Sequence, residues 1–180
     1  MPGANEPTIL LYKEAPAECR DYDPRAAEVA ATVAKMITAR LPDVTVEHIG
    51  STAIPGCAGK GVVDLMILYA SGQLERVKVL LDELGFQRQS TRDPWPEERP
   101  MRLGAIAFDN KIFRLHTHII HKGAEEVREL RRFRDLLRSD DNLRAAYISR
   151  KRGIIASGVT DSVDYSMAKD SFIKSILNQR

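Results

Sequence analysis

One stretch of the sequence, residues 47–67, constrains the fold more than any other. It reads EHIGSTAIPGCAGKGVVDLMI. Alternating and continuous apolar residues predict strands over 44–49 and 62–69, and the glycines with Pro55 predict a turn between them. The second strand carries a single carboxylate, Asp64, in an otherwise apolar run. A sheet with a polar site at the end of a glycine-rich turn is the expected result.

The turn begins with Gly50, Ser51 and Thr52. Glycine lets the backbone approach a ligand closely, and the two hydroxyls can donate to phosphate oxygens. Lys60 would supply the countercharge. The alternative is an ordinary strand-to-loop turn with a solvated lysine. The segment is not a P-loop, because Ile54 stands where that motif needs glycine and Gly61 where it needs Ser or Thr.

Asp64 is costly to bury unless it is paired or bound to a metal. We expect it to hold a divalent metal near the anion, and the alternative is a structural ion pair. Met66 occupies the position where a second metal-binding carboxylate would sit.

Arg114, His116 and His118 alternate along a predicted strand and therefore share one face. One arginine and two imidazoles on one face are typical of a phosphate site or a metal site, although isolated histidines are often structural. The expectation is a site shared with Asp64, with Arg114 as a further countercharge.

The rest of the chain predicts one domain over residues 1–180, of the α+β class, or of the α/β class if its sheet is mainly parallel. One helix is expected to begin at Pro24 and to end at about Leu41, and a second helix is expected over 73–84. A loop is expected over 87–102, with strands over 106–108 and 112–120, and a helical C-terminal segment over about 124–180.

Composition narrows the class of protein. Residues 1–16 lack a signal pattern, no apolar run approaches the ~20 residues of a membrane span, and two cysteines suit a reducing compartment, so a cytoplasmic protein is expected. The basic excess after residue 110 lacks interleaved aromatics. It predicts a solvated helix face, or a basic wall beside a phosphate site, rather than a nucleic-acid surface.

The run Glu47–Thr52, with Lys60 and Asp64 after it, resembles the signature of the GrpB-like family. The His116-Thr117-His118 strand and the Phe-Arg-Asp-Leu-Leu-Arg helix at 133–138 resemble the same family, as do Tyr147, Lys151, Tyr165, Lys169 and Phe172. Cys57 and Gly61 depart from its usual Leu and Pro. The family is similar to the nucleotidyltransferase superfamily, in which Gly-Ser precedes a strand with two carboxylates.

This resemblance implies a nucleotidyltransferase-like small mixed sheet with flanking helices. It implies transfer of a nucleoside monophosphate from an NTP to an unknown acceptor with Mg²⁺ or Mn²⁺. Asp64, His116 and His118 would be catalytic, and Asp64 and His118 would hold the metal. Because Met66 replaces a carboxylate and histidine is a poor Mg²⁺ ligand, two alternatives stay open. They are a nucleotide-binding module without turnover and a metal-dependent phosphoesterase.

Overall fold

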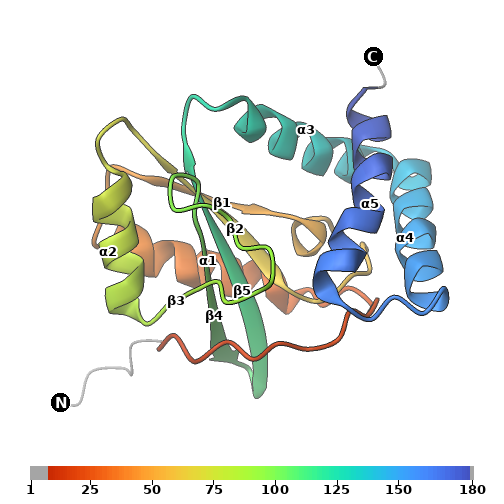
Figure 1. The fold of residues 1–180 in the computed structure, drawn as a ribbon, viewed down its shortest axis with the longest axis horizontal. Coiled ribbons are helices and arrows are strands. Elements are labelled where there is room, and N and C mark those ends of the chain that lie inside the picture. The colour runs from red at the N-terminus through yellow and green to blue at the C-terminus, as the bar shows by residue number, and fades with distance from the viewer. Residues whose placement is uncertain (1–7, 179–180) are drawn as a thin grey trace.

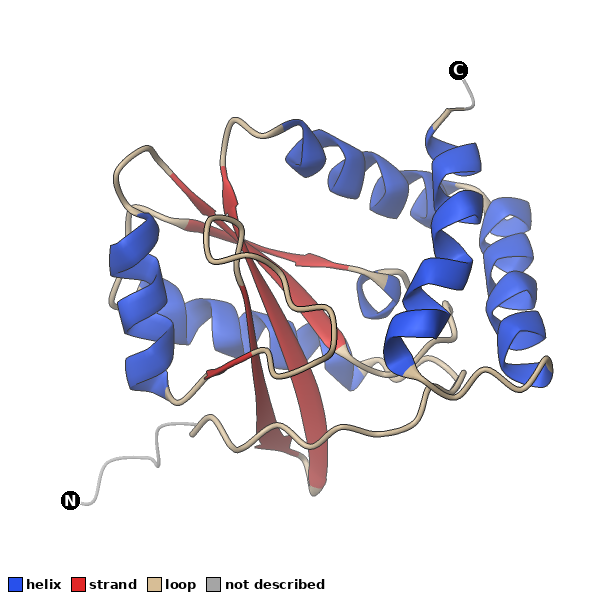
Figure 2. Ribbon diagram, viewed as in Figure 1, coloured by secondary structure: helices blue, strands red, loops and turns tan. Residues whose placement is uncertain are grey.

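The computed structural model describes residues 8–178, whose strands form one mixed sheet in the order β1-β2-β5-β4-β3 (Figures 1 and 2). The strands are β1 (Thr45–Ile49), β2 (Val63–Tyr69), β3 (Gln87–Arg88), β4 (Met101–Phe108) and β5 (Lys111–His121). The helices are α1 (Arg25–Thr38), α2 (Leu74–Leu84), α3 (Glu125–Ser139), α4 (Asp141–Ala156) and α5 (Ser162–Leu177). A single 3₁₀ turn, η1 (Ser51–Ala53), follows β1.

β2 carries Asp64 and pairs antiparallel with β1 and parallel with β5. Its odd-numbered side chains join the main core with residues of α1 and α2. Its even-numbered side chains face the other way, where Met66 and Leu68 pack against Val127 of α3. Alternation along a strand thus places Asp64 on the face that the C-terminal helices cover. A second core joins α3, α4 and α5 to the turn at Ile54 and Cys57.

The predicted strands over 44–49, 62–69 and 112–120 lie in one sheet, as the alternation indicated. The predicted loop over 87–102 is wrong at both ends. It contains β3, and β4 begins at Met101. Arg102 looked like a loop residue, but it is fully buried and forms ion pairs with Asp82 and Glu97, each at 3.0 Å. Paired in this way, a charged side chain is tolerated inside the strand.

The N-terminal segment crosses the sheet outside the regular strands (red in Figure 1). Leu10 forms an antiparallel bridge with Ala105, and Arg20 forms one with Gly59. The backbone nitrogen of Tyr12 donates to the Gln87 side chain at 2.8 Å. The segment thereby carries Tyr12 to the strand β5.

In the described part of the chain, no helix is long and apolar enough to cross a membrane.

Candidate functional site

The site is built on neighbouring positions of two parallel strands. Asp64 of β2 is the register partner of His116, and Met66 is the partner of His118. The Asp64 Oδ1 atom lies 3.4 Å from His116 Nδ1 and 3.8 Å from His118 Nε2. Gly50 closes over the carboxylate, since a Cβ there would lie 2.5 Å from Asp64 Oδ2. The structure therefore brings the carboxylate and both imidazoles together, as the sequence predicted.

Tyr12 extends this group to a third element. Its hydroxyl lies 3.0 Å from His116 Nε2, on the side of the ring opposite Asp64. Burial lowers the pKa of His116 and raises the pKa of Tyr12, so both are neutral near pH 7. Burial alone would raise the pKa of Asp64, but the His116 and His118 imidazoles that face the carboxylate outweigh burial and hold this pKa well below its ordinary range. Tyr12, His116 and Asp64 therefore form a row of polar contacts, the Tyr12–His116–Asp64 chain. Because a carboxylate accepts a hydrogen bond and does not donate one, the proton of His116 is assigned to Nδ1, which faces Asp64.

Three lysines from different elements gather beside Asp64. Lys60 donates to Ser162 Oγ at 2.8 Å, and its ammonium lies 5.5 Å from the centre of the Tyr165 ring. Lys169 lies over the same ring at 4.6 Å. Lys151 is 1% exposed and donates to Ser51 Oγ at 2.9 Å and to the carbonyl of Ala58.

The nearby Asp64 carboxylate offsets only part of the charge of Lys60 and Lys169. Within residues 8–178, none of the three lysines forms an ion pair with a carboxylate. Burial, and then the charges of Lys60 and Lys151, lower the pKa of Lys169 to about 7. Burial also lowers the pKa of Lys60 and of Lys151. A cluster of lysines that disfavour their own protonation is a ready site for an anion, because an anion relieves the repulsion.

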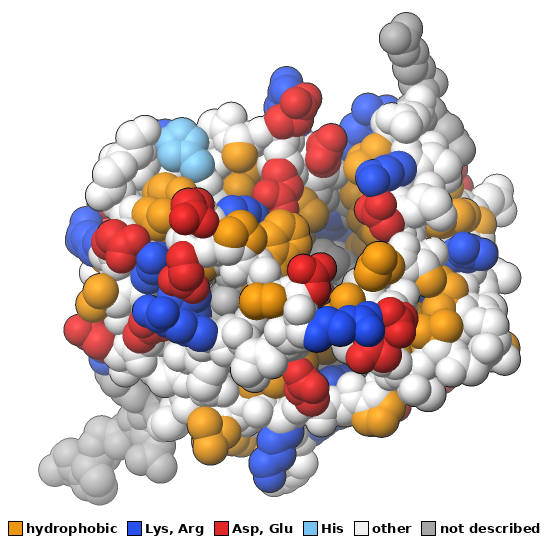
Figure 3. Space-filling model, in the orientation of Figure 1, with side chains coloured by type: hydrophobic (Ala, Val, Ile, Leu, Met, Phe, Trp, Pro, Cys, Tyr) orange, Lys and Arg blue, Asp and Glu red, His pale blue; other side chains and the backbone are white. Residues whose placement is uncertain are grey.

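A cavity of about 630 Å³ opens in front of these groups, between the sheet, the loop 89–100 and α5. Asp64, His116, His118, Lys60 and Lys169 line its inner part, and Tyr12 lines its wall. The exposed residues Glu14, Asp93 and Asp170 also line it. Figure 3 shows the hollow at the centre of this face, with hydrophobic side chains on either side. Its size suits a nucleotide.

The turn at Gly50, Ser51 and Thr52 lies behind this cavity rather than in its wall. The expectation that the Thr52 hydroxyl binds phosphate is corrected, since it donates to the Val62 carbonyl and contacts His48 Nε2 at 2.9 Å. Ser51 accepts a hydrogen bond from Lys151. The turn therefore holds Asp64 and Lys151 in place, and Lys60 is the predicted phosphate residue that lines the cavity.

Arg114 also contacts protein groups outside the cavity. Its guanidinium donates to the Lys60 carbonyl at 3.0 Å and lies 3.9 Å from the Glu18 carboxylate. It is on the same sheet face as His116 but does not line the cavity. Arg114 thus fixes the backbone that carries Lys60.

The residues do not fit the Mg²⁺ or Mn²⁺ site that the resemblance implied. Met66 is fully buried among apolar side chains, so the position of a second carboxylate is closed. His118 Nδ1 faces the Arg99 guanidinium at 3.4 Å, which disfavours a cation there. Among residues 8–178, no group of three or more His, Cys, Asp and Glu is arranged to hold a metal ion. The metal role of Asp64 and His118 stays a prediction without a coordination site.

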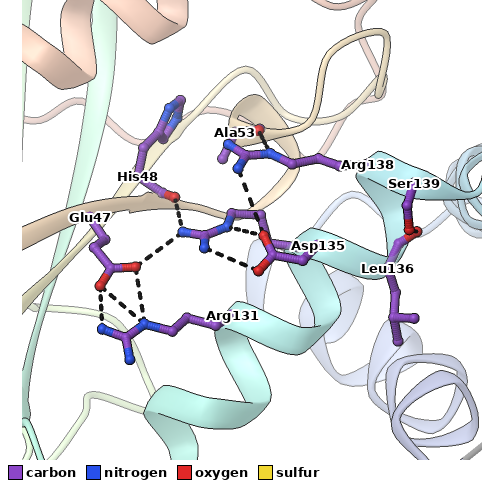
Figure 4. A network of polar contacts seen from close by, with 9 residues as sticks. Glu47, His48, Ala53, Arg131, Asp135, Leu136, Arg138 and Ser139 are labelled. Atoms are coloured by element: carbon purple, nitrogen blue, oxygen red, sulfur yellow. Dashed lines mark hydrogen bonds and ion pairs between the residues drawn. The ribbon is translucent and has the colours of Figure 1, made fainter.

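Glu47 joins β1 to α3 behind the site (Figure 4). Its carboxylate accepts from Arg131 Nε at 3.1 Å and from Arg134 Nη1 at 3.2 Å, and Arg134 also donates to the His48 carbonyl at 3.2 Å. Arg138 donates to the Ala53 carbonyl at 2.8 Å. The predicted solvated helix face is wrong at Arg134, whose side chain is 13% exposed, whereas the side chains of Arg131 and Arg138 remain 43% exposed. The three arginines anchor α3 to β1 and to the turn.

Replacing Glu47 with glutamine is expected to lower the free energy of unfolding by about 1–3 kcal/mol, because two arginines lose an anionic acceptor. The hydrogen bond from Arg131 is the main cause that lowers the pKa of Glu47. Its contribution is therefore full above pH ~4 and is lost as pH falls below that value. Urea titration at pH 7 and pH 3 measures both effects. Glu125→Gln is the control, since its exposed pair with Arg128 is expected to contribute little.

Sequence reasoning missed several residues that line the cavity or lie behind it. Tyr12 lies in a segment without a periodic pattern, and Trp95 lies in the predicted loop. Lys151 and Lys169 belonged to the family resemblance but carried no predicted role. Lys151 of α4 and Lys169 of α5 lie on the helix faces that point toward Asp64, and this placement was the signal that could have identified them.

Comparison with known proteins places this geometry in a family. A family model described as GrpB protein matches residues 16–179. A UPF0157 protein of Streptomyces coelicolor is 36% identical over 157 residues, covering 87% of this chain and 80% of that protein. One of Halalkalibacterium halodurans is 28% identical over 162 residues, covering 88% and 80%.

Solved structures agree in fold. The crystal structure of GrpB from Enterococcus faecalis has a TM-score of 0.69 at 24% identity, covering 90% of this chain and 96% of that chain. The structure of mtPAP in complex with CTP has a TM-score of 0.51 at 16% identity, covering 76% and 33%. The fold is nucleotidyltransferase-like, as the resemblance implied.

Proposed function

The chain belongs to the GrpB family, and from that premise we propose that it binds a nucleotide through its phosphates in the 630 Å³ cavity. The lysines at its inner end carry the proposal. Lys60 and Lys169 line the cavity without an ion-paired carboxylate among residues 8–178, and Lys151 stands behind them. A phosphate chain supplies the negative charge that this cluster lacks. The mtPAP neighbour, whose structure contains CTP, supports the same ligand class.

The test is binding without metal. Wild type is expected to bind both ATP and tripolyphosphate in EDTA, measured by isothermal titration calorimetry. Lys60→Met is expected to weaken both by about 10- to 100-fold, the usual size of a lost hydrogen bond to a charged group. The control is Lys122→Met, an exposed lysine that does not line the cavity. Wild-type binding of neither ligand would overturn the proposal.

Transfer of the nucleoside monophosphate to an acceptor hydroxyl is the second candidate, and the Tyr12–His116–Asp64 chain favours it. The acceptor oxygen would attack the α-phosphorus, the bond from that phosphorus to the bridging oxygen would break, and pyrophosphate would leave. The acceptor proton would pass to His116 Nε2 through the Tyr12 hydroxyl, while Asp64 stabilises the resulting imidazolium. Lys60 and Lys169 would offset the charge that develops on the phosphates.

The reaction products distinguish nucleotidyl transfer from the phosphoesterase and binding-module alternatives. Release of pyrophosphate together with a nucleotide-modified acceptor supports transfer. Release of inorganic phosphate without transfer supports the phosphoesterase alternative, and intact ATP in a stable complex supports a binding module. The acceptor is identified by supplying ATP labelled at the α-phosphate and following the label by mass spectrometry.

A further inference from the structure

We propose that Trp95 and Met167 form the two sides of a nucleobase clamp at the outer part of the cavity. The inference rests on the proposed phosphate site and adds the place where the base binds. Both side chains line the cavity, one from the loop 89–100 and the other from α5. Both are exposed large hydrophobic residues, with 42% and 66% of their surface accessible.

Trp95 is held in a fixed orientation. The Arg99 guanidinium lies 4.3 Å from the centre of its ring, which covers one face of the indole. Arg99 is itself anchored, since its Nε donates to Glu126 at 2.8 Å. The backbone nitrogen of Trp95 donates to the Gln89 side chain at 3.0 Å, and His118 meets the ring edge-on at 5.9 Å. The indole is therefore a rigid platform whose second face is open to a ligand.

The charges of the cavity orient the ligand. Its inner part carries Lys60 and Lys169 together with the carboxylate of Asp64, whereas its exposed lining carries the carboxylates of Glu14, Asp93 and Asp170. Phosphates are attracted to the two inner lysines and repelled by the three exposed carboxylates, so the uncharged base of the nucleotide lies outward. Trp95 and Met167 are exposed large hydrophobic side chains in the cavity lining. A flat base stacks on indole, and a thioether packs on its other face.

Trp95 is the single tryptophan of the chain, so its fluorescence reports directly on the clamp. We expect ATP and CTP to quench the emission of the wild-type protein and tripolyphosphate to leave it nearly unchanged. Saturation with ATP, verified by calorimetry, without any change in emission would overturn the clamp.

Two variants test the same point by affinity. Trp95→Leu is expected to weaken ATP by about 5- to 100-fold, the range for loss of one stacked base. Met167→Ala is expected to weaken ATP by a few-fold, because less apolar surface is removed. Tripolyphosphate affinity is expected to stay within two-fold, about the precision of the measurement. Val79→Ala is the matched control, an exposed apolar residue of α2 outside the cavity.

The ratio of ATP affinity to tripolyphosphate affinity separates this inference from the proposed function. A fall of the ratio in Trp95→Leu and not in Val79→Ala supports the clamp. An unchanged ratio with both ligands bound would overturn the clamp and leave the phosphate site standing. If neither ligand binds wild type, the proposed function fails and the clamp fails with it.

Discussion

Asp64→Asn is expected to destabilise the fold by about 2–3 kcal/mol and, in the same protein, to tighten binding of tripolyphosphate. Asp64 is the anion that faces His116, His118 and Lys60, so its loss leaves their donors and charge unbalanced. We place the cost below that of a fully buried pair because 25% of the side chain is exposed. The gain in binding, about 5- to 10-fold, follows from removing a negative charge beside the phosphates.

Thermal melts and calorimetry, both without metal, measure these opposite effects. Asp43→Asn is the control, since its pair with Arg76 is at the surface. Because the pKa of Asp64 is lowered in the folded state, the stability difference between wild type and variant is full above pH ~4 and shrinks as pH falls below it. A nucleotide titration with added Mg²⁺ tests the metal role. An unchanged melting temperature together with loss of metal-dependent nucleotide binding in the variant would support the metal role predicted from the sequence.

Lys169→Met is expected to weaken tripolyphosphate binding at pH 6 by about 10- to 100-fold. In wild type, affinity is expected to fall as pH rises from 6 to 9, because the Lys169 ammonium, with a pKa of about 7, loses its charge in that range. In the variant this part of the pH dependence disappears. Calorimetry at pH 6, 7, 8 and 9 measures the slope, with Lys122→Met as the control.

The same substitution has the opposite effect on stability. A lowered pKa means that the unfolded chain binds more protons than the folded chain between pH ~7 and ~10, so wild-type stability rises with pH across that window. Lys169→Met removes the buried ammonium, and we expect it to be more stable than wild type at pH 6 and to lack the rise. A variant that is less stable at pH 6, with unchanged affinity, would make Lys169 a structural residue.

Much of the fold was predictable because local pattern and packing agree. Apolar alternation located β2 and β5, and the helical periods located α2 and the C-terminal helices. The fold prediction failed where residues far away in the sequence stabilise a charged strand or an irregular segment. Arg102 is accepted in β4 only because Asp82 and Glu97 neutralise it. The course of residues 8–22 depends on single bridges to β4 and to Gly59, which no local pattern indicates.

The candidate site was likewise predictable only where local sequence pattern determines it. Period-two alternation was sufficient to place His116 and His118 on one face and Asp64 on the face beside them. The lysine cluster was not predictable, because Lys60, Lys151 and Lys169 meet only after α4 and α5 pack across the sheet. The glycine-rich turn was predicted as a ligand contact, yet it supports the site from behind. Its hydroxyls are engaged with the protein, which a sequence pattern alone does not reveal.

The bridge between Leu10 and Ala105 has a further consequence for the outer edge of the sheet. Beyond the two-residue strand β3, the outer edge of β4 would present unpaired amide and carbonyl groups that another sheet can join. Leu10 takes up both groups of Ala105, at 2.7 and 3.0 Å, and two residues later the same segment delivers Tyr12 to His116. Protection of the sheet edge and completion of the cavity wall are thus a single docking event. A molecule whose N-terminal segment has come away loses its defence against edge-to-edge association at the same moment as it loses Tyr12.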